Sequence, residues 1–95
     1  KVLKRADWDL KEVDIFELNE AFSSQSLAVM KDLGIGSELV NLHGGALAIG
    51  HPLGASGARI TGKAASLLKS TNSNRAIATM CIGGGMGIAI ALEKI

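Results

Sequence analysis

The sequence has 95 residues, of which 10 are basic and 9 acidic, and its formal net charge at pH 7 is +1. The two signs are interspersed along the chain, so no basic stripe points to nucleic acid or to an anionic membrane. No apolar run is long and uninterrupted enough to span a bilayer. A chain of this length forms at most one small domain.

The apolar content of 47% comes with only 3% aromatic residues. Small and branched aliphatic side chains suit thin, closely packed layers of helix and sheet. The single cysteine, Cys81, cannot form an internal disulfide, and no signal peptide is visible, so an intracellular compartment is expected. His43, His51 and Cys81 are too few and too widely spaced for zinc, and no metal site is expected.

Residues 1–6 have the pattern of the end of a helix that begins outside the sequence, so we expect a C-terminal piece of a longer protein. Residues 6–14 are typical of a connection with one helical turn. Asp9 is placed to cap that turn, and Leu10 and Val13 are placed to pack inward.

Residues 13–18 form a short branched and aromatic run. This composition predicts a strand that is covered on both faces, except where Asp14 and Glu17 reach an edge. A helix is predicted from Phe22 to a stop at Gly34. Its apolar positions recur at helical spacing: Phe22, Ser26, Val29, Met30 and Leu33.

Asn19 lies at the junction between this strand and this helix, and two interpretations are open. Asparagine is a common N-cap, so the side chain can simply cap the helix. Alternatively, the amide points into a cleft at the carboxyl end of the strand, where open α/β sheets place their ligands. The two roles do not exclude each other.

Residues 36–42 are predicted to form a loop and a short extended segment. Residues 44–59 are rich in glycine, and the only proline of the chain, Pro52, directly follows His51. Glycine permits unusual backbone angles and proline fixes them, so His51 is expected in a rigid turn. His43 lacks this setting and is interpreted as a loop residue without a role.

A second helix is predicted from Ala55 onward. Its apolar face holds Ile60, Ala64, Leu67, Leu68 and Thr71, opposite Lys63, Ser66 and Lys69. The positive end of a helix dipole disfavours a second positive charge, so a histidine beside it tends to stay neutral and able to accept a proton. This observation alone supports a base only weakly, because lone loop histidines are more often structural.

The C-terminal segment is predicted to form a polar turn at residues 71–74 and two strands at residues 76–82 and 86–92. Three glycines separate the strands, which predicts an antiparallel hairpin. Cys81 lies at the end of the first strand. It is either inert packing or a thiol that a substrate can approach closely beside the glycines.

Neither glycine cluster fits a nucleotide site. The triplet at residues 83–85 leads into a strand, whereas a dinucleotide fingerprint opens a helix. The glycines at residues 50, 54 and 57 do open a helix, but the Lys-Ser or Lys-Thr pair of a phosphate-binding loop is missing.

Three short blocks occur in order: NEAF at residues 19–22, GHP at residues 50–52 and CIGGGMG at residues 81–87. Together they resemble the C-terminal domain of the thiolase family over residues 8–93, and most of all the acetoacetyl-CoA thiolases. The resemblance implies an α/β, thiolase-like layered fold with a mixed sheet between helix layers. Residues 1–95 would be part of the C-terminal domain, and the N-terminal domain would lie outside the sequence.

The same resemblance implies roles for four residues. His51 would activate a nucleophilic cysteine that becomes acylated, and Cys81 would move the proton at the second substrate. Asn19 would hold a water that forms an oxyanion hole together with the histidine. The backbone N–H of Gly83 would contribute to another oxyanion hole. Residues that bind coenzyme A are not identified.

The implied reaction is the reversible condensation of two acetyl-CoA into acetoacetyl-CoA and CoA, in lipid and fatty acid metabolism. CoA thioesters would be substrates and no cofactor would be bound permanently. The family also implies a homo-oligomer, dimer or tetramer, in the cytoplasm, with mitochondria and peroxisomes left open. Since the nucleophilic cysteine is not in this sequence, the chain alone is expected to be inactive.

Three alternatives accompany this interpretation. A non-catalytic thiolase-like protein would bind acyl-CoA or lipid, but it would not need Asn19, His51 and Cys81 together. A 3-ketoacyl-CoA thiolase of fatty acid degradation would share the same chemistry. A β-ketoacyl synthase is less consistent with the CIGGGMG block.

Overall fold

Three strands form one mixed sheet in the computed structural model, which describes residues 1–95. The strands are β1 (Ile15–Leu18), β2 (Arg75–Gly83) and β3 (Met86–Glu93), in the spatial order β1-β2-β3. β1 and β2 run parallel, with Leu18 opposite Thr79, whereas β2 and β3 run antiparallel. The helices are α1 (Val2–Ala6), α2 (Ser23–Leu33), α3 (Ala46–Ile49) and α4 (Ser56–Ser70), with 3-10 turns η1 (Leu10–Glu12) and η2 (Ser37–Leu39).

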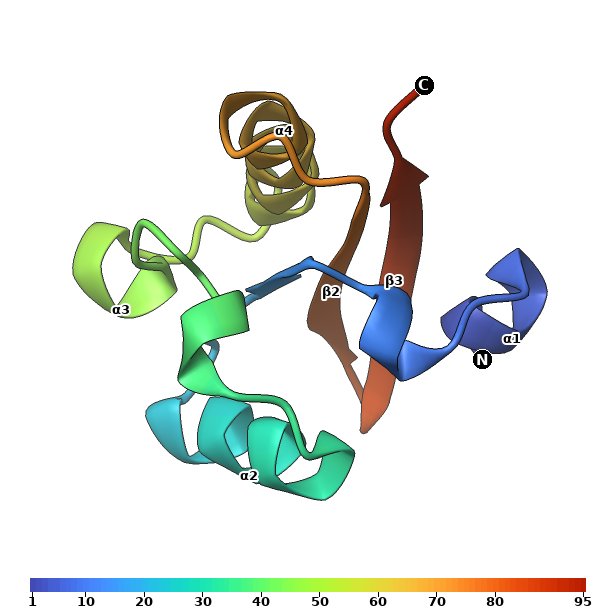
Figure 1. Ribbon diagram of the computed structural model, residues 1–95. Helices are drawn as coiled ribbons and strands as arrows, with labels where there is room; N and C mark the ends of the chain where they lie inside the picture. Colours follow the sequence, from blue (N-terminus) through green and yellow to red (C-terminus); the bar gives the residue numbers. More distant parts are fainter.

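The sheet lies between helix layers. α4 covers one face and α2 lies on the other, as Figure 1 shows. The α4 layer encloses one apolar cluster of seven buried residues: Ile15, Ile60, Ala64, Leu67, Leu68, Ala76 and Ala78. The opposite layer encloses Val13, Phe16, Leu18, Val40 and Ile77, with partly buried residues of α1 and α2 packed against them. The expected α/β fold with a mixed sheet between helix layers is confirmed.

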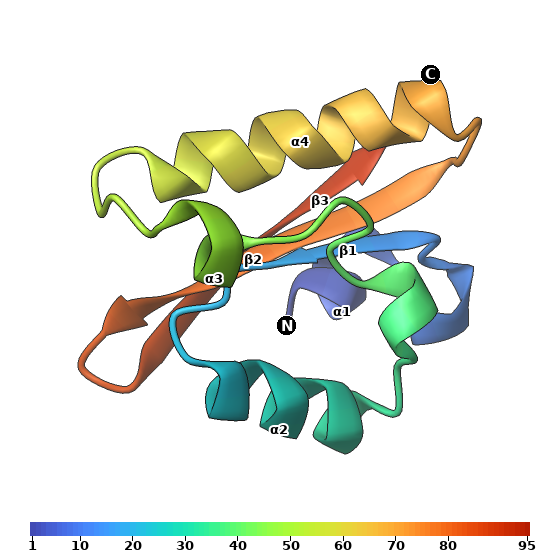
Figure 2. The same ribbon diagram turned by 90° about the vertical axis from the view of Figure 1, so that its left-hand side faces the viewer.

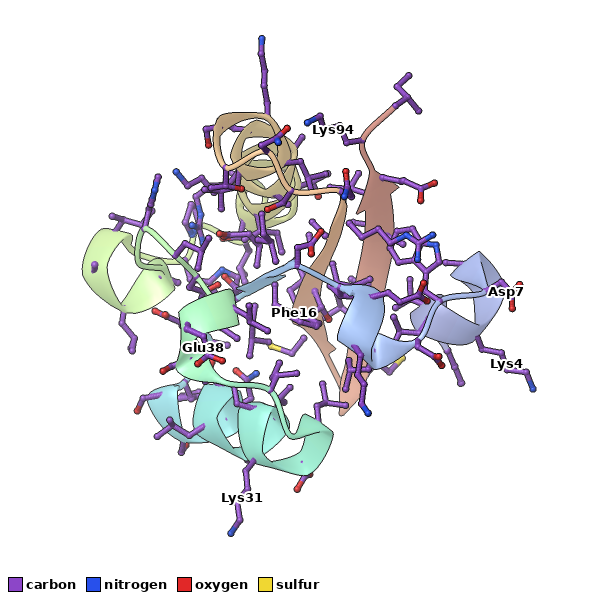
Figure 3. All side chains as sticks on the ribbon, viewed as in Figure 1. Lys4, Asp7, Phe16, Lys31, Glu38 and Lys94 are labelled. Carbon is purple, nitrogen blue, oxygen red and sulfur yellow. The ribbon has the colours of Figure 1, made fainter.

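Neighbouring strand residues alternate between these two clusters because successive side chains of a strand point to opposite faces. Ile15 packs against α4 while Phe16 packs on the α2 side. Figure 3 shows Phe16 in the interior, whereas Lys4 and Lys31 point outward from the molecule. The predicted apolar face of α4 is confirmed at four of its five positions, since Thr71 is exposed and ends the helix.

The two predicted C-terminal strands are confirmed as a hairpin. Its turn is Gly84-Gly85, with φ of 60° and 73°. Positive φ at both central residues is what a primed hairpin turn requires, and glycine adopts it without strain. The helical turn after Asp9 is also confirmed, and Val13 is buried.

Three details of the sequence-based prediction are wrong. Glu17 does not reach an exposed edge, because β2 on one side and the chain at Val40 on the other enclose β1, and only 1% of Glu17 is exposed. Phe22 is not on the buried face of α2, since it precedes the helix and is 71% exposed. The short helix α3 was not expected within the glycine-rich block.

Candidate active site

The candidate site lies at the edge of the sheet where the parallel strands β1 and β2 end. Asn19 directly follows β1, and Cys81 lies near the end of β2. Figure 2 shows that α3, the loop before α4 and the hairpin turn gather at this same end. Carboxyl ends of parallel strands are where open α/β sheets place ligands, so the topology itself assembles the predicted residues.

Asn19 is held in place by the sheet and is 1% exposed. Its backbone N–H donates to the Thr79 carbonyl at 2.9 Å, which extends the β1–β2 ladder by one residue. The capping interpretation is wrong, because Phe22 occupies the N-cap of α2. The amide instead turns toward α4, where Nδ2 lies 3.3 Å from Nε2 of His51.

Arg59 contacts the Asn19 amide from the first turns of α4. Its Nη2 donates to Oδ1 of Asn19 at 3.4 Å. A guanidinium has donors only, so the amide atom that faces it is the oxygen, and the NH2 group faces His51. This NH2 group donates to Nε2 of His51, which therefore carries a lone pair.

The contact of the second ring nitrogen, Nδ1, shows which nitrogen of His51 carries the proton. Nδ1 lies 2.6 Å from Oγ of Ser56, a residue with no exposed surface. Because Nε2 carries the lone pair in the neutral ring, Nδ1 carries the proton and donates it to Ser56. The half-buried His51 thus presents Nε2 as an acceptor, which is the form that a general base needs.

The backbone around His51 is tightly turned, as predicted. Gly50 has φ of 91°, which favours glycine, and its N–H donates to the Ala46 carbonyl at 2.8 Å. The Pro52 carbonyl accepts the N–H groups of Ala55 and Ser56, each at 2.9 Å. The first bond closes the end of α3 just before His51, and the other two form the turn that follows it and leads into α4.

Glu20 anchors α3 to the end of β1. One carboxylate oxygen accepts the N–H of Leu47 in the first turn of α3 at 2.9 Å, and the other accepts Nδ2 of Asn41 at 2.9 Å. Asn41 in turn bonds both backbone groups of Leu18. A carboxylate at a helix N-terminus is favourable for the unpaired N–H groups and for the helix dipole.

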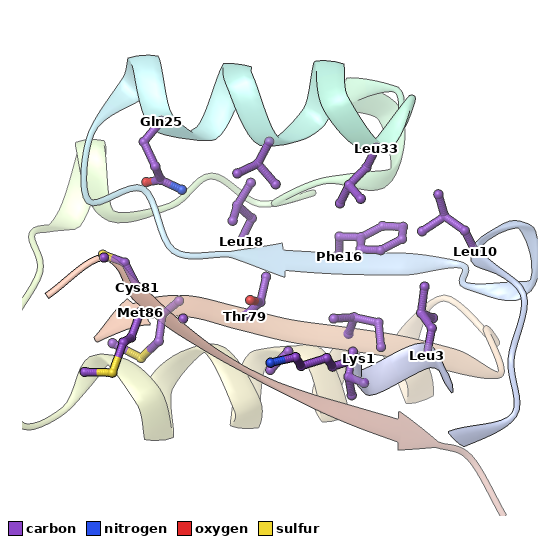
Figure 4. A pocket seen from close by; sticks show the side chains of 17 residues that line it. Lys1, Leu3, Leu10, Phe16, Leu18, Gln25, Leu33, Thr79, Cys81 and Met86 are labelled. Carbon is purple, nitrogen blue, oxygen red and sulfur yellow. The ribbon is translucent and has the colours of Figure 1, made fainter. Parts of the chain in front are cut away.

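Cys81 approaches the same edge from the other face of the sheet. The thiol side chain is exposed and lines a groove of about 400 Å³ between the sheet and α2, together with Leu18, Gln25, Thr79 and Met86. Figure 4 shows Cys81 beside Met86 at one end of this groove. No hydrogen bond joins Cys81 to Asn19 or His51, and the interpretation as buried packing is wrong for this structure.

Gly83 has φ of 88° and lies at a register shift between the two strands of the hairpin. An L side chain is strained in this conformation. The backbone next to Cys81 is therefore free of side chains from Gly83 to Gly85, which allows a substrate to approach it closely. The role of the Gly83 N–H as an oxyanion donor stays a prediction.

Glu17 is a buried carboxyl group beneath the site. It shares the α4 face of β1 with Asn19, two residues further along the strand direction. Burial raises its pKa above the usual value of 4.5, against the opposing positive charges of Arg59 and Lys63. One carboxyl oxygen and the Nε of Arg59 are buried without a hydrogen-bond partner.

The structure thus brings Asn19 and His51 into contact and places Cys81 at the same sheet edge. Sequence reasoning missed Ser56, Arg59 and Glu20. Ser56 and Arg59 are three residues apart at the start of the predicted helix, a spacing that places both on one helical face and was the available signal. His43 is exposed and accepts a hydrogen bond from Lys63 at 2.7 Å.

No group of three or more His, Cys, Asp or Glu side chains converges as a metal site would require. None of the helices combines the length and apolar character needed to cross a membrane.

Comparison with known proteins agrees with this geometry. Residues 1–94 match the family model described as "Thiolase, C-terminal domain". The chain is 50% identical, over its whole length, to an acetyl-CoA acetyltransferase of Shinella zoogloeoides and covers 24% of that protein. It is 48% identical over 99% of its length to the cytosolic acetyl-CoA acetyltransferase of Rattus norvegicus, again covering 24%. It is 51% identical to a 3-ketoacyl-CoA thiolase of Aeromonas hydrophila, of which it covers 25%.

A solved structure is similar as well. The crystal structure of the Bacillus anthracis acetyl-CoA acetyltransferase superposes with a TM-score of 0.92 at 44% identity, covering 96% of this chain and 23% of that one. The chain therefore belongs to the thiolase family, by its C-terminal domain. It spans about a quarter of the length of the curated relatives that it matches.

Proposed function

We propose that residues 1–95 are the C-terminal part of a thiolase that transfers acyl groups between CoA thioesters, with His51 as the base of the acylation step. The observation that carries this proposal is the unprotonated Nε2 of His51, held by Asn19 on one side and by the Ser56 contact on the other. The family match and the acetyltransferase names of the relatives support it.

In the first half-reaction, a cysteine thiol from a part of the enzyme outside this chain gives its proton to Nε2 of His51. The thiolate attacks the carbonyl carbon of acetyl-CoA, and the C–S bond to CoA breaks. The leaving CoA thiolate takes the proton from the imidazolium, which leaves an acetyl-enzyme and free CoA. We propose that the Asn19 amide holds a water that donates to the developing oxyanion beside His51.

In the second half-reaction, the Cys81 thiolate takes a proton from the α-carbon of a second acetyl-CoA. The carbanion attacks the acetyl-enzyme carbonyl, a carbon–carbon bond forms, and the enzyme's acyl-carrying thiolate is released together with acetoacetyl-CoA. The proton on Cys81 then passes to this thiolate, which restores the nucleophile as a thiol and Cys81 as a thiolate. In this proposal His51 acts from the α4 side, where it contacts Asn19, and Cys81 acts from the α2 side, where it lines the groove. The reacting carbons therefore have to lie beyond the strand ends, between the two groups.

A longer-chain 3-ketoacyl-CoA is a second candidate substrate. The chain is as similar to a 3-ketoacyl-CoA thiolase, at 51% identity, as to an acetyl-CoA acetyltransferase, at 50%. Thiolysis rates with acetoacetyl-CoA and with a medium-chain 3-ketoacyl-CoA decide between the two. We further propose a homo-oligomer in the cytoplasm, in line with the cytosolic name of one relative.

The test compares His51→Ala with His43→Ala in the full-length enzyme. Acetyl-enzyme formation from acetyl-CoA is followed by mass spectrometry of the quenched protein. Loss of a general base costs about 10²–10⁴ in rate, so we expect this deficit for His51→Ala and none for the exposed His43→Ala. The 95-residue chain alone is expected to form no adduct.

Two results would contradict the proposal. Wild-type acylation kinetics in His51→Ala would show that the base is assigned wrongly. A full-length protein that binds acetyl-CoA but never becomes acylated would support a non-catalytic binding protein instead.

A further inference from the structure

Arg59 lies in the first turns of α4 and extends toward Asn19. It supplies the one hydrogen bond that Oδ1 of Asn19 receives, at 3.4 Å, and its own Nε is buried without a partner. No hydrogen bond joins the half-buried guanidinium to His51, whose ring bonds Asn19 and Ser56. Its influence on the histidine therefore passes through the Asn19 amide.

From this geometry we infer that Arg59 is a positioning residue that keeps His51 in the tautomer with an unprotonated Nε2. The inference rests on the proposed function, because only a base needs that lone pair. Of the two groups that contact the imidazole, Ser56 cannot select the tautomer. A hydroxyl both donates and accepts, so it satisfies Nδ1 in either protonation state.

The amide of Asn19 is equally ambiguous without Arg59. A rotation by about half a turn about its terminal bond exchanges a donor for an acceptor of almost the same size. With the oxygen toward His51, the proton would reside on Nε2 and the ring would no longer accept one there. Arg59 removes the ambiguity because a guanidinium offers donors and no acceptor.

Glu17 gives the Arg59 cation a second electrostatic partner. Its carboxyl group is 1% exposed on the face of β1 that α4 covers, and Arg59 is the cation that acts on it most strongly, followed by Lys63. Lys63 lies one turn further along α4 and bonds to His43 rather than to Asn19. It is therefore the matched control, a cation near Glu17 without a path to His51.

The experiment uses the full-length enzyme with the variants Arg59→Met, Arg59→Lys and Lys63→Met. Methionine keeps an unbranched apolar stem and removes every donor, whereas lysine keeps a donor-only cation. Two quantities are measured: the single-turnover acetylation rate, and the protonated ring nitrogen of His51 by ¹⁵N NMR of histidine-labelled protein. The His51 signal is assigned by its loss in His51→Ala.

We expect Arg59→Met to slow acetylation on the order of 10², the scale of a misplaced catalytic group, with KM for acetyl-CoA unchanged. The ring proton should move from Nδ1 to Nε2. Arg59→Lys should restore the Nδ1-protonated signal and most of the rate. Lys63→Met should leave the acetylation rate and the Nδ1-protonated signal at wild-type values.

Wild-type acetylation in Arg59→Met would overturn the inference. A slower enzyme with the proton still on Nδ1 would also overturn it, since the loss would then be structural. The two proposals fail separately. If His51→Ala acylates normally, the proposed function is wrong, whereas if His51→Ala is inactive and Arg59→Met is not, only the role of Arg59 is wrong.

Discussion

Nδ2 of Asn19 lies 3.3 Å from Nε2 of His51, although 32 residues separate the two in the sequence. Asn19 reaches this position because it continues the β1–β2 ladder. His51 reaches it because it lies between the short helix α3 and the proline turn that leads into α4. The contact joins an amide donor to an imidazole lone pair. A substitution that removes the donor at residue 19 therefore tests the protonation state assigned to His51.

Asn19→Asp should reverse the polarity of this contact with almost no change in shape. A carboxylate only accepts hydrogen bonds, so it should draw a proton onto Nε2 of His51 and block its use as a base. We expect acetylation to slow by about 10²–10⁴, measured in single-turnover experiments. Asn72→Asp is the control, because its Oδ1 accepts a bond from Lys94 that an aspartate retains. An active Asn19→Asp enzyme would contradict the assigned tautomer.

Glu20→Ala should loosen the segment that carries His51. The substitution removes the acceptor for the Leu47 N–H at the start of α3 and for Asn41 at the edge of β1. Misplacement of a catalytic group by about 1 Å costs up to about 10² in rate, so acetylation should slow while the thiol chemistry of Cys81 is untouched. Glu38→Ala removes a carboxylate from η2 and should leave the rate unchanged. Equal rates in both variants would show that α3 holds His51 without Glu20.

The main elements of this fold were predictable because local patterns determine them. The helical period from Ile60 to Leu68 predicted α4 and its buried face, and the glycine triplet between two apolar runs predicted the hairpin. α3 was not predictable, because its N-terminus is satisfied by Glu20, 27 residues earlier in the chain. The same holds for Glu17, whose burial depends on the segment at Val40 that closes the edge of β1.

The sequence allowed three residues of the candidate site to be predicted, but not the hydrogen bonds between them and their neighbours. His51 and Cys81 stood out by their glycine and proline surroundings, and Asn19 by its place after a strand. The spacing of Ser56 and Arg59 places them on one helical face, but it does not identify their partners, which they meet only where the start of α4 lies against the end of β1. The capping role of Asn19 was wrong for the same reason: a tertiary partner took its side chain.

Glu17→Gln should change the pH dependence of stability in a defined direction. Burial raises the pKa of Glu17 above 4.5 in the folded protein, so the folded state holds more protons than the unfolded state just above that pH. The contribution of Glu17 to the stability of the fold is then highest at low pH, and it falls as the pH rises through the pKa of Glu17 in the folded state. Glutamine cannot ionise, so we expect the melting temperature of the variant to rise relative to wild type as the pH increases above 4.5.

Glu12→Gln provides the comparison with the opposite sign. The hydrogen bond from the Asp9 backbone and the nearby Arg75 lower the pKa of Glu12. Its contribution is therefore present above pH 4.5 and is lost as the pH falls through the folded pKa. The ion pair of Glu12 and Arg75 is exposed, so the effect on melting temperature should be small.

The Glu17 prediction has a clear contradictory outcome. A fall in the melting temperature of Glu17→Gln above pH 4.5 would show that Glu17 stabilises the fold as a charged partner of Arg59.

Cys81→Ser should separate the two half-reactions, because Cys81 lines the groove on the α2 side and has no bond to His51. Serine is close in size to cysteine, so the hairpin should keep its structure, but a hydroxyl is far less acidic than a thiol and does not form the anion that takes a proton from acetyl-CoA. We expect a full burst of acetyl-enzyme in the full-length variant, followed by turnover reduced by about 10²–10⁴. Quenched-flow mass spectrometry measures the burst, and acetoacetyl-CoA formation measures the turnover. Near wild-type turnover would show that Cys81 does not move the proton of the second substrate. Loss of the burst itself, as in His51→Ala, would mean that both residues serve acylation. The two half-reactions would then not be assigned separately to His51 and Cys81.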